Sequence, residues 1–183
     1  MLAMLILASK STTRKALLEQ AGLGFSTAPA TIDERALETA AIAAGGDGRD
    51  VALLLARHKA EAVAKTHPGA IVIGADQTLS LGTELLHKPT DRHDAATQLD
   101  HLHGKTHRLH AAVTLVRDDV LLWSDIQTAE LTMREFTVQE RDDVLDREGD
   151  AILASVGGYF TILGLPLLPL LAALRMIAPE TLQ

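Results

Sequence analysis

The sequence predicts an α/β fold, because strand signals and helix signals are mixed along the whole chain. Residues 2–8 and residues 70–75 are short continuous apolar runs, as strands buried on both faces are. A helix is expected over residues 12–20 directly after the first run, and an Ala/Leu-rich helix over about residues 50–65 before the second. No internal repeat divides the sequence, so we expect one domain over residues 1–183.

Capping signals set the expected helix boundaries. Ser11 or Thr12 can cap the N-terminus of the first helix, and Gly22 or Gly24 lies just beyond its end. The other predicted helices are residues 50–65 after the loop at residues 45–48, residues 91–103 before Gly104, residues 137–149 from a capping box, and a Leu-rich helix that starts at Pro166.

Further strands are expected in the second half of the chain. Residues 78–81 and 84–86 flank Gly82-Thr83, as the two arms of a hairpin do. Residues 108–117 read as one strand, and residues 120–133 as one or two more.

Composition excludes several classes of protein. The 183 residues are 47% hydrophobic and carry a net charge of −7, with no Cys and five aromatic residues. The absence of Cys excludes disulfides, iron–sulfur clusters and a Cys nucleophile, and it favours a cytoplasmic protein. An acidic chain with few aromatic residues argues against a nucleic-acid partner. The apolar residues 1–8 are too short for a membrane span, and Gly and Pro interrupt residues 162–174, so no membrane partner is expected.

The loop after the first strand is a candidate phosphate site. Ser9 and Ser11 lie where a helix N-terminus offers free backbone N–H groups to an anion. Arg14 and Lys15 fall in the first turn of that helix, where a cation is disfavoured unless an anion is bound nearby. The alternative is a solvated basic turn.

Asp76 follows directly on the buried run of residues 70–75. A carboxylate there would emerge at the end of the sheet, where α/β proteins build their sites, and could hold Mg²⁺ or orient a water. The alternative is an Asp that caps a turn.

Lys59 is out of place on its helix. At about 100° per residue it falls opposite Arg57 and Glu61, between Leu55 and Val63. It either snorkels along apolar surface or directs its ammonium into a cleft that holds phosphate.

Three other features are weaker on their own. Lys88 precedes Pro89 and is therefore held extended, whereas the adjacent carboxylates Asp33 and Glu34 are typical of a solvated loop. The histidines between residues 101 and 110 match no standard zinc spacing.

Together these segments resemble the Maf family of nucleoside triphosphate pyrophosphatases, also known as septum-formation inhibitors. The resemblance covers residues 5 to about 133 and residues 159–175. The motifs that carry it are residues 5–14 (LILASKSTTR), Asp33-Glu34, residues 55–60 (LARHKA), 73–77 (IGADQ), 87–89 (HKP), 104–107 (GKTH) and 162–167 (ILGLPL).

The resemblance implies an elongated mixed sheet flanked by helices, of the inosine triphosphate pyrophosphatase type, with two lobes around a nucleotide cleft. It implies Mg²⁺-dependent cleavage of a nucleoside triphosphate between the α and β phosphates, with Mn²⁺ or another divalent cation as a substitute, and a homodimer in many members. The implied roles are substrate binding by Ser9, Ser11, Arg14, Lys59 and Lys88, metal binding by Glu34 and Asp76, and activation of the attacking water by Asp76.

Three departures from the family pattern bear on activity. Thr13 stands where a basic or aromatic residue is common, and Gln77 replaces the Thr of the branch that prefers dTTP and UTP. Gln77 instead resembles the branch that acts on 7-methyl-GTP. A family segment of two strands and a Gly-rich turn is missing between Gly158 and Tyr159. The alternative function is therefore a degenerate nucleotide-binding regulator of cell division without turnover.

Overall fold

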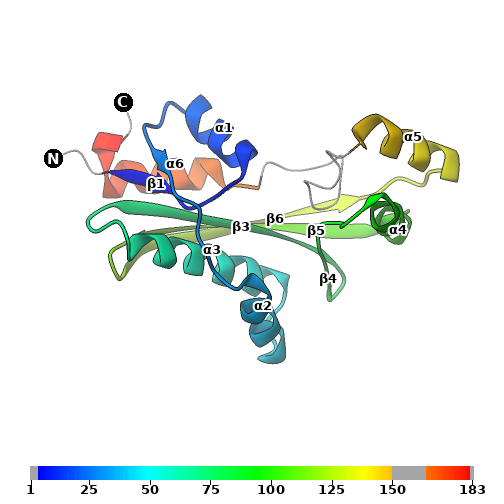
Figure 1. The fold of residues 1–183 in the computed structure, drawn as a ribbon, viewed down its shortest axis with the longest axis horizontal. Helices are drawn as coiled ribbons and strands as arrows, with labels where there is room; N and C mark the ends of the chain where they lie inside the picture. Colours follow the sequence, from blue (N-terminus) through cyan, green and yellow to red (C-terminus); the bar gives the residue numbers. More distant parts are fainter. Residues whose placement is uncertain (1–3, 150–163, 182–183) are drawn as a thin grey trace. The chain divides into compact units, whose positions relative to one another are not determined.

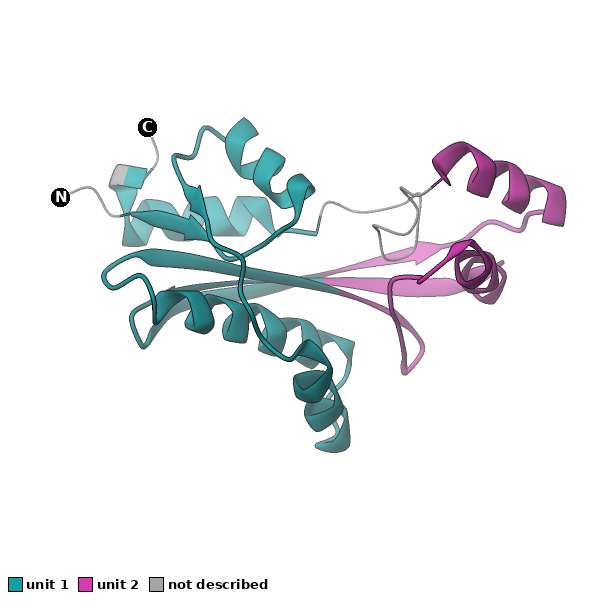
Figure 2. Cartoon of the chain, in the orientation of Figure 1, with its two compact units in different colours: residues 1–77, 111–127, 163–183 teal, residues 78–110, 128–162 magenta. Residues whose placement is uncertain are grey.

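The computed structural model describes residues 4–149 and 164–181. The chain forms two compact units (Figure 2). Unit 1 comprises residues 1–77, 111–127 and 163–183, and unit 2 comprises residues 78–110 and 128–162. The segment between Gly158 and Tyr159, where a family insert is expected to be missing, lies outside the described residues.

The strands form one mixed sheet, which confirms the predicted α/β class. Its order is β2-β1-β3-β5-β6, with β4 paired to β3. Strand β1 is parallel to β2 and β3, whereas β3 and β4 are antiparallel. The strands are β1 (Leu5–Leu7), β2 (Ser26–Thr27), β3 (Ile71–Leu81), β4 (Glu84–Leu86), β5 (Thr106–Arg117) and β6 (Val120–Thr132).

Strand β3 differs from the sequence prediction. Residues 70–75 and 78–81 were expected as two strands with Asp76 beyond the end of the first, but Ile71–Leu81 is one continuous strand that contains Asp76. A charged residue is tolerated inside this buried strand because Lys59 pairs with its carboxylate.

The helices of unit 1 are α1 (Thr12–Gln20), α2 (Glu34–Ala43), α3 (Gly48–Ala64) and α6 (Leu167–Ile177), followed by the short 3₁₀ helix η3 (Pro179–Thr181). Helix α1 has its predicted bounds, and Ser11 rather than Thr12 caps it. Helix α2 is absent from the sequence prediction. The expected solvated loop at Asp33 and Glu34 is wrong, because the Asp33 side chain accepts a hydrogen bond from the Ala36 N–H and starts this helix.

Both faces of the sheet are covered in unit 1 (Figure 1). On one face, Leu170 and Leu174 of α6 share a buried cluster with Leu5 of β1 and Ile71 of β3. On the other face, the small residues of α3 pack against Ile6 and Val72. The sheet therefore offers no open apolar face here, as the continuous apolar strands predict.

Unit 2 holds helices α4 (Arg92–Leu102) and α5 (Val138–Glu148). Helix α5 is capped as predicted, by the capping box of Thr137, and Asp91 caps α4. Arg141 of α5 bonds to Asp100 of α4 at 2.5 Å, and Leu145 packs with Ala95. No helix within the described residues is long and apolar enough to cross a membrane.

Candidate functional site

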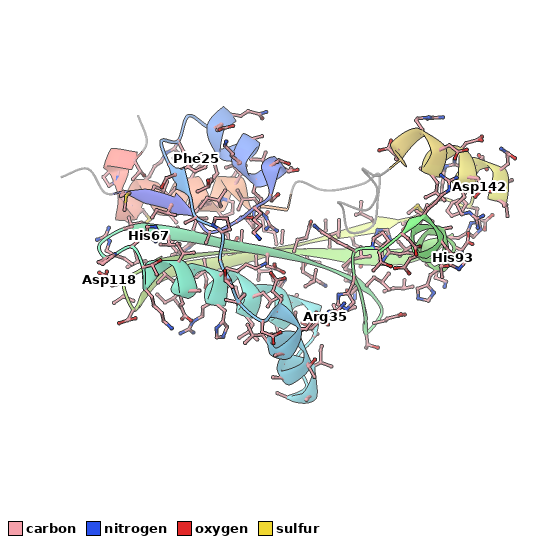
Figure 3. The ribbon with its side chains drawn as sticks, viewed as in Figure 1. Phe25, Arg35, His67, His93, Asp118 and Asp142 are labelled. Atoms are coloured by element: carbon pink, nitrogen blue, oxygen red, sulfur yellow. The ribbon has the colours of Figure 1, made fainter. Side chains whose placement is uncertain are left out.

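Polar side chains from five segments of unit 1 meet beside the sheet. They come from the loop after β1, the first turn of α1, the first residue of α2, the middle of α3, and β3. Helix α2 starts at Glu34, and the next residue, Arg35, is labelled in Figure 3. The site residues themselves are Ser9, Arg14, Glu34, Lys59 and Asp76.

Lys59 joins two carboxylates at this site. Its Nζ lies 2.5 Å from Asp76 Oδ1 and 3.0 Å from Glu34 Oε1. The side chains of Lys59 and Asp76 are 13% and 10% exposed, whereas Glu34 is 54% exposed and reaches the solvent. Of the two alternatives for Lys59, the ion pairs favour an ammonium directed inward, and Arg57 pairs with Glu61 on the outer face of the same helix.

Arg14 is held by three acceptors. Its Nε–H donates to the Gly164 carbonyl at 3.0 Å, and Nη1 donates to the Ala75 carbonyl at 3.0 Å and to Ser9 Oγ at 3.3 Å. Burial lowers the pKa of the guanidinium, while the charges of Asp76 and Glu34 act in the opposite direction. The first turn of α1 thus carries a fixed, partly buried cation.

The two predicted serines have distinct local roles. Ser11 Oγ accepts the backbone N–H of Arg14 at 3.3 Å, which caps the start of α1. Ser9 Oγ accepts both the Ser11 N–H, at 3.2 Å, and Arg14 Nη1. Together they hold the loop and the guanidinium in one arrangement.

The pKa of Asp76 is shifted by its burial and by the charges around it. Burial raises the pKa of its carboxyl group, and the neighbouring Lys59 and Arg14 cations oppose that rise. Glu34 raises it further, as a second negative charge does. Asp76 lies just beyond the last parallel pair of β1 and β3, Leu7 with Ile73, so it still emerges at the carboxyl end of the parallel strands.

The remaining predicted residues lie elsewhere. Gln77 follows Asp76, and its Oε1 approaches Gly164. Thr13 is exposed on α1. Lys88 is exposed on the segment after β4, and it belongs to unit 2 whereas the other site residues belong to unit 1.

Two contacts of the site were not foreseen from the sequence: the carbonyls of Ala75 and Gly164, which accept hydrogen bonds from Arg14. Residue type carries no signal for a backbone acceptor, because every residue has one. The only hint was that Gly164 lies inside the motif of residues 162–167.

The two carboxylates of the site are oxygen ligands of the kind that hard cations prefer. Among the residues that the structure describes, no group of three or more Asp, Glu or His side chains could hold a metal ion. Glu34 and Asp76 nevertheless both contact the one ammonium of Lys59, so they can share a single cationic centre. Mg²⁺ is commonly held by one or two carboxylates together with substrate phosphates, and this pair fits that chemistry.

The mixed sheet and the charged cluster define an α/β protein with its site at the carboxyl ends of parallel strands. Comparison with known sequences gives the family: the model described as Maf-like protein matches residues 4–177, and the chain belongs to this family.

Similar proteins include the 7-methyl-GTP pyrophosphatase of Brucella abortus, which is 48% identical over 93% of this chain and 94% of its own length. The nucleoside triphosphate pyrophosphatase of Rhodopseudomonas palustris strain HaA2 is 47% identical over 93% of this chain and 92% of its own length. Among solved structures, a HAM1 protein from Coxiella burnetii has a TM-score of 0.46 at 14% identity, covering 84% of this chain and 100% of that one.

The alignment with the Brucella abortus protein spans 188 residues, more than the 183 of this chain, although it covers only 93% of the chain. The relative therefore carries residues within the matched span that have no counterpart here. This agrees with a missing family segment.

Proposed function

We propose that this protein is a nucleoside triphosphate pyrophosphatase, which releases a nucleoside monophosphate and pyrophosphate. Family membership and the names of the two relatives support the reaction class. The observation that carries the proposal is the cluster of Arg14, Lys59 and Asp76, which places two largely buried cations and one carboxylate together in a chain of net charge −7.

The cations suit a polyphosphate, because phosphoryl transfer is catalysed mainly by positioning and charge stabilisation. Arg14 is fixed by three acceptors and can bind phosphate oxygens without being reoriented. Lys59 neutralises the charge that develops on the leaving pyrophosphate. Lys88 is proposed to assist it, on the strength of the family motif at residues 87–89.

Asp76 is the proposed general base. It accepts a proton from the attacking water while the bond between the α phosphorus and the bridging oxygen breaks, and that oxygen leaves with pyrophosphate. A raised pKa makes a carboxylate a better proton acceptor. Glu34 and Asp76 would hold a divalent cation, Mg²⁺ by preference or Mn²⁺, which when bound neutralises phosphate charge.

Gln77 supports a purine substrate of the 7-methyl-GTP kind. It stands at the position where the family branches differ, and the Brucella abortus relative is named for that substrate. Ser9 and Ser11 keep the loop that carries Arg14 in place. Thr13 remains a candidate for base selectivity.

The test is a panel of canonical and modified triphosphates with Mg²⁺, in which the products are separated. We expect monophosphate and pyrophosphate, fastest from 7-methyl-GTP, and no turnover after a chelator removes the cation. Asp76→Asn should lower kcat by at least about 100-fold, as loss of a general base does. The exposed Asp119→Asn is the matched control and should keep the wild-type rate.

Products of diphosphate and orthophosphate would overturn the cleavage position. Tight nucleotide binding in a calorimeter without turnover would instead favour the alternative of a nucleotide-binding regulator, which the residues missing relative to the Brucella abortus protein make worth measuring. The cytoplasmic location, the homodimer and the lack of a nucleic-acid partner stay predictions of the sequence.

A further inference from the structure

Gly164 is a buried glycine with a left-handed backbone, at φ +53°. Its carbonyl accepts the Nε–H of Arg14 at 3.0 Å across 150 residues of sequence. A side chain is disfavoured at this φ, because a Cβ there crowds the adjacent carbonyl.

A side chain at residue 164 would point toward Gln77. A Cβ added at Gly164 would lie 3.1 Å from Gln77 Oε1 and 3.5 Å from Gln77 Cδ, and 3.7 Å from Arg14 Nη2. A contact of 3.1 Å is closer than carbon and oxygen atoms normally approach, so the Gln77 amide would have to move. A side chain at residue 164 would therefore displace the amide by a few tenths of an ångström.

We propose that Gly164 is a positioning residue that fixes the Gln77 amide beside the Arg14 guanidinium and thereby sets selectivity among nucleobases. Its carbonyl orients the proposed phosphate-binding cation, and its bare Cα sets how closely the amide approaches that cation. One backbone unit thus fixes the distance between the two groups. This inference rests on the proposed function, in which Gln77 favours a purine substrate of the 7-methyl-GTP kind.

Gly149 offers a matched control. Its φ is +51°, nearly that of Gly164, but an added Cβ would meet no atom within 4 Å. The positive φ strains an Ala at either position, and of the two only residue 164 has a methyl group that presses on Gln77. Comparing Gly149→Ala with Gly164→Ala therefore separates the effect of the strained backbone from the effect of the contact with Gln77.

The measured quantity is the ratio of kcat/KM for 7-methyl-GTP to kcat/KM for UTP. Both substrates are assayed on one preparation, so any loss of folded protein cancels in the ratio. Gly164→Ala should change the ratio about tenfold, the value of one displaced hydrogen bond, with most of the change in KM. Gly149→Ala should leave it within about twofold of wild type.

A double-mutant cycle tests whether the effect passes through Gln77. In a Gln77→Ala background no amide is present to be displaced, so Gly164→Ala should no longer change the ratio. Gly164→Asn is the second variant, because Asn tolerates the left-handed region better than Ala and favours folding while still crowding the amide. An unchanged ratio in both variants, or an equal change with and without Gln77, overturns the proposal.

The outcome is separable from that of the proposed function. The ratio of dissociation constants for the same two nucleotides, measured by calorimetry, gives the selectivity even if the wild-type protein hydrolyses neither. Binding without turnover would therefore refute the pyrophosphatase activity alone, whereas a binding ratio insensitive to Gly164→Ala and Gly164→Asn would refute the positioning role.

Discussion

Arg14 shows how one side chain can be fixed from several directions. The three acceptors of its guanidinium are a serine hydroxyl and two backbone carbonyls, which come from three separate segments of the chain. A planar guanidinium presents its donors in a rigid fork, which a lysine ammonium cannot reproduce. The orientation of the cation, and not only its charge, is therefore built into unit 1.

Arg14→Lys should accordingly lose activity although the charge is kept. We expect kcat/KM for the preferred triphosphate to fall by about 100-fold, since a misplaced charge-stabilising group costs about that much. Steady-state kinetics measure the effect. Lys15→Met is the control, because Lys15 is half-exposed and pairs with Glu19 at 3.6 Å. A wild-type rate for Arg14→Lys would contradict the fixed-fork interpretation.

The sequence identified the charged members of the site better than their partners. The helical wheel put Lys59 on the inner face because a lone charge between Leu55 and Val63 breaks the pattern. The acceptors of Arg14 could not be found in this way, since the fold and not the residue type decides which carbonyls a guanidinium meets. The catalytic, substrate-binding, metal-binding and specificity roles assigned to the site residues all stay predictions.

At the scale of elements, the contact of β3 with α3 depends on Gly74. A Cβ at Gly74 would lie 2.0 Å from the Ala56 carbonyl oxygen and 2.8 Å from the Ala60 Cβ. The helix backbone lies on one side and the buried strand on the other, so neither can yield. This close approach brings Lys59 of α3 within reach of Asp76 of β3.

Gly74→Ala should therefore destabilise the protein by about 3 kcal/mol, the upper range for overpacking a core. Urea denaturation measures the free energy of unfolding. Gly24→Ala is the matched control, because an added Cβ there meets nothing within 4 Å, and its unfolding free energy should stay within about 0.5 kcal/mol of wild type. Equal stability of the two variants would show that α3 can shift away from the strand.

Elements were predicted where capping and apolar pattern agreed, and missed where either was weak. Helix α1 has a hydroxyl cap and a glycine beyond its end, and it has its predicted bounds. Helix α2 was missed because the Asp33-Glu34 pair at its start was interpreted as a solvated loop, and the helix has no fully buried residue. Strand β3 looked interrupted because Asp76 and Gln77 are polar, whereas a long-range ion pair with α3 keeps the strand intact.

At the scale of the whole molecule, stability should depend on pH through a buried histidine. His107 on β5 is 3% exposed, and its Nδ1 has no hydrogen-bond partner among the described residues. Burial lowers its pKa below the ordinary 6.5, and a hydrogen bond with the Lys105 backbone opposes the shift in part. Below pH 6.5 the unfolded chain thus binds a proton that the folded chain does not yet bind.

The free energy of unfolding should therefore fall as the pH decreases from 6.5 toward the lowered pKa of folded His107. His107→Leu should flatten this dependence, because it removes the titrating group and the unpaired nitrogen together. Urea denaturation across this pH range measures the slope. The exposed His93→Gln is the control and should keep the wild-type slope; an unchanged slope in His107→Leu would assign the acid sensitivity to other groups.

The hydrogen bond from Arg14 to Gly164 also decides when, during synthesis and folding, the proposed site can form. Arg14 leaves the ribosome well before Gly164, whose carbonyl orients the guanidinium and is made 150 residues later. Contacts of such separation form late in folding. A nascent chain, or one truncated before residue 164, therefore holds every proposed catalytic side chain and still lacks the carbonyl that aligns Arg14, so the protein completes its site only after Gly164 has been made.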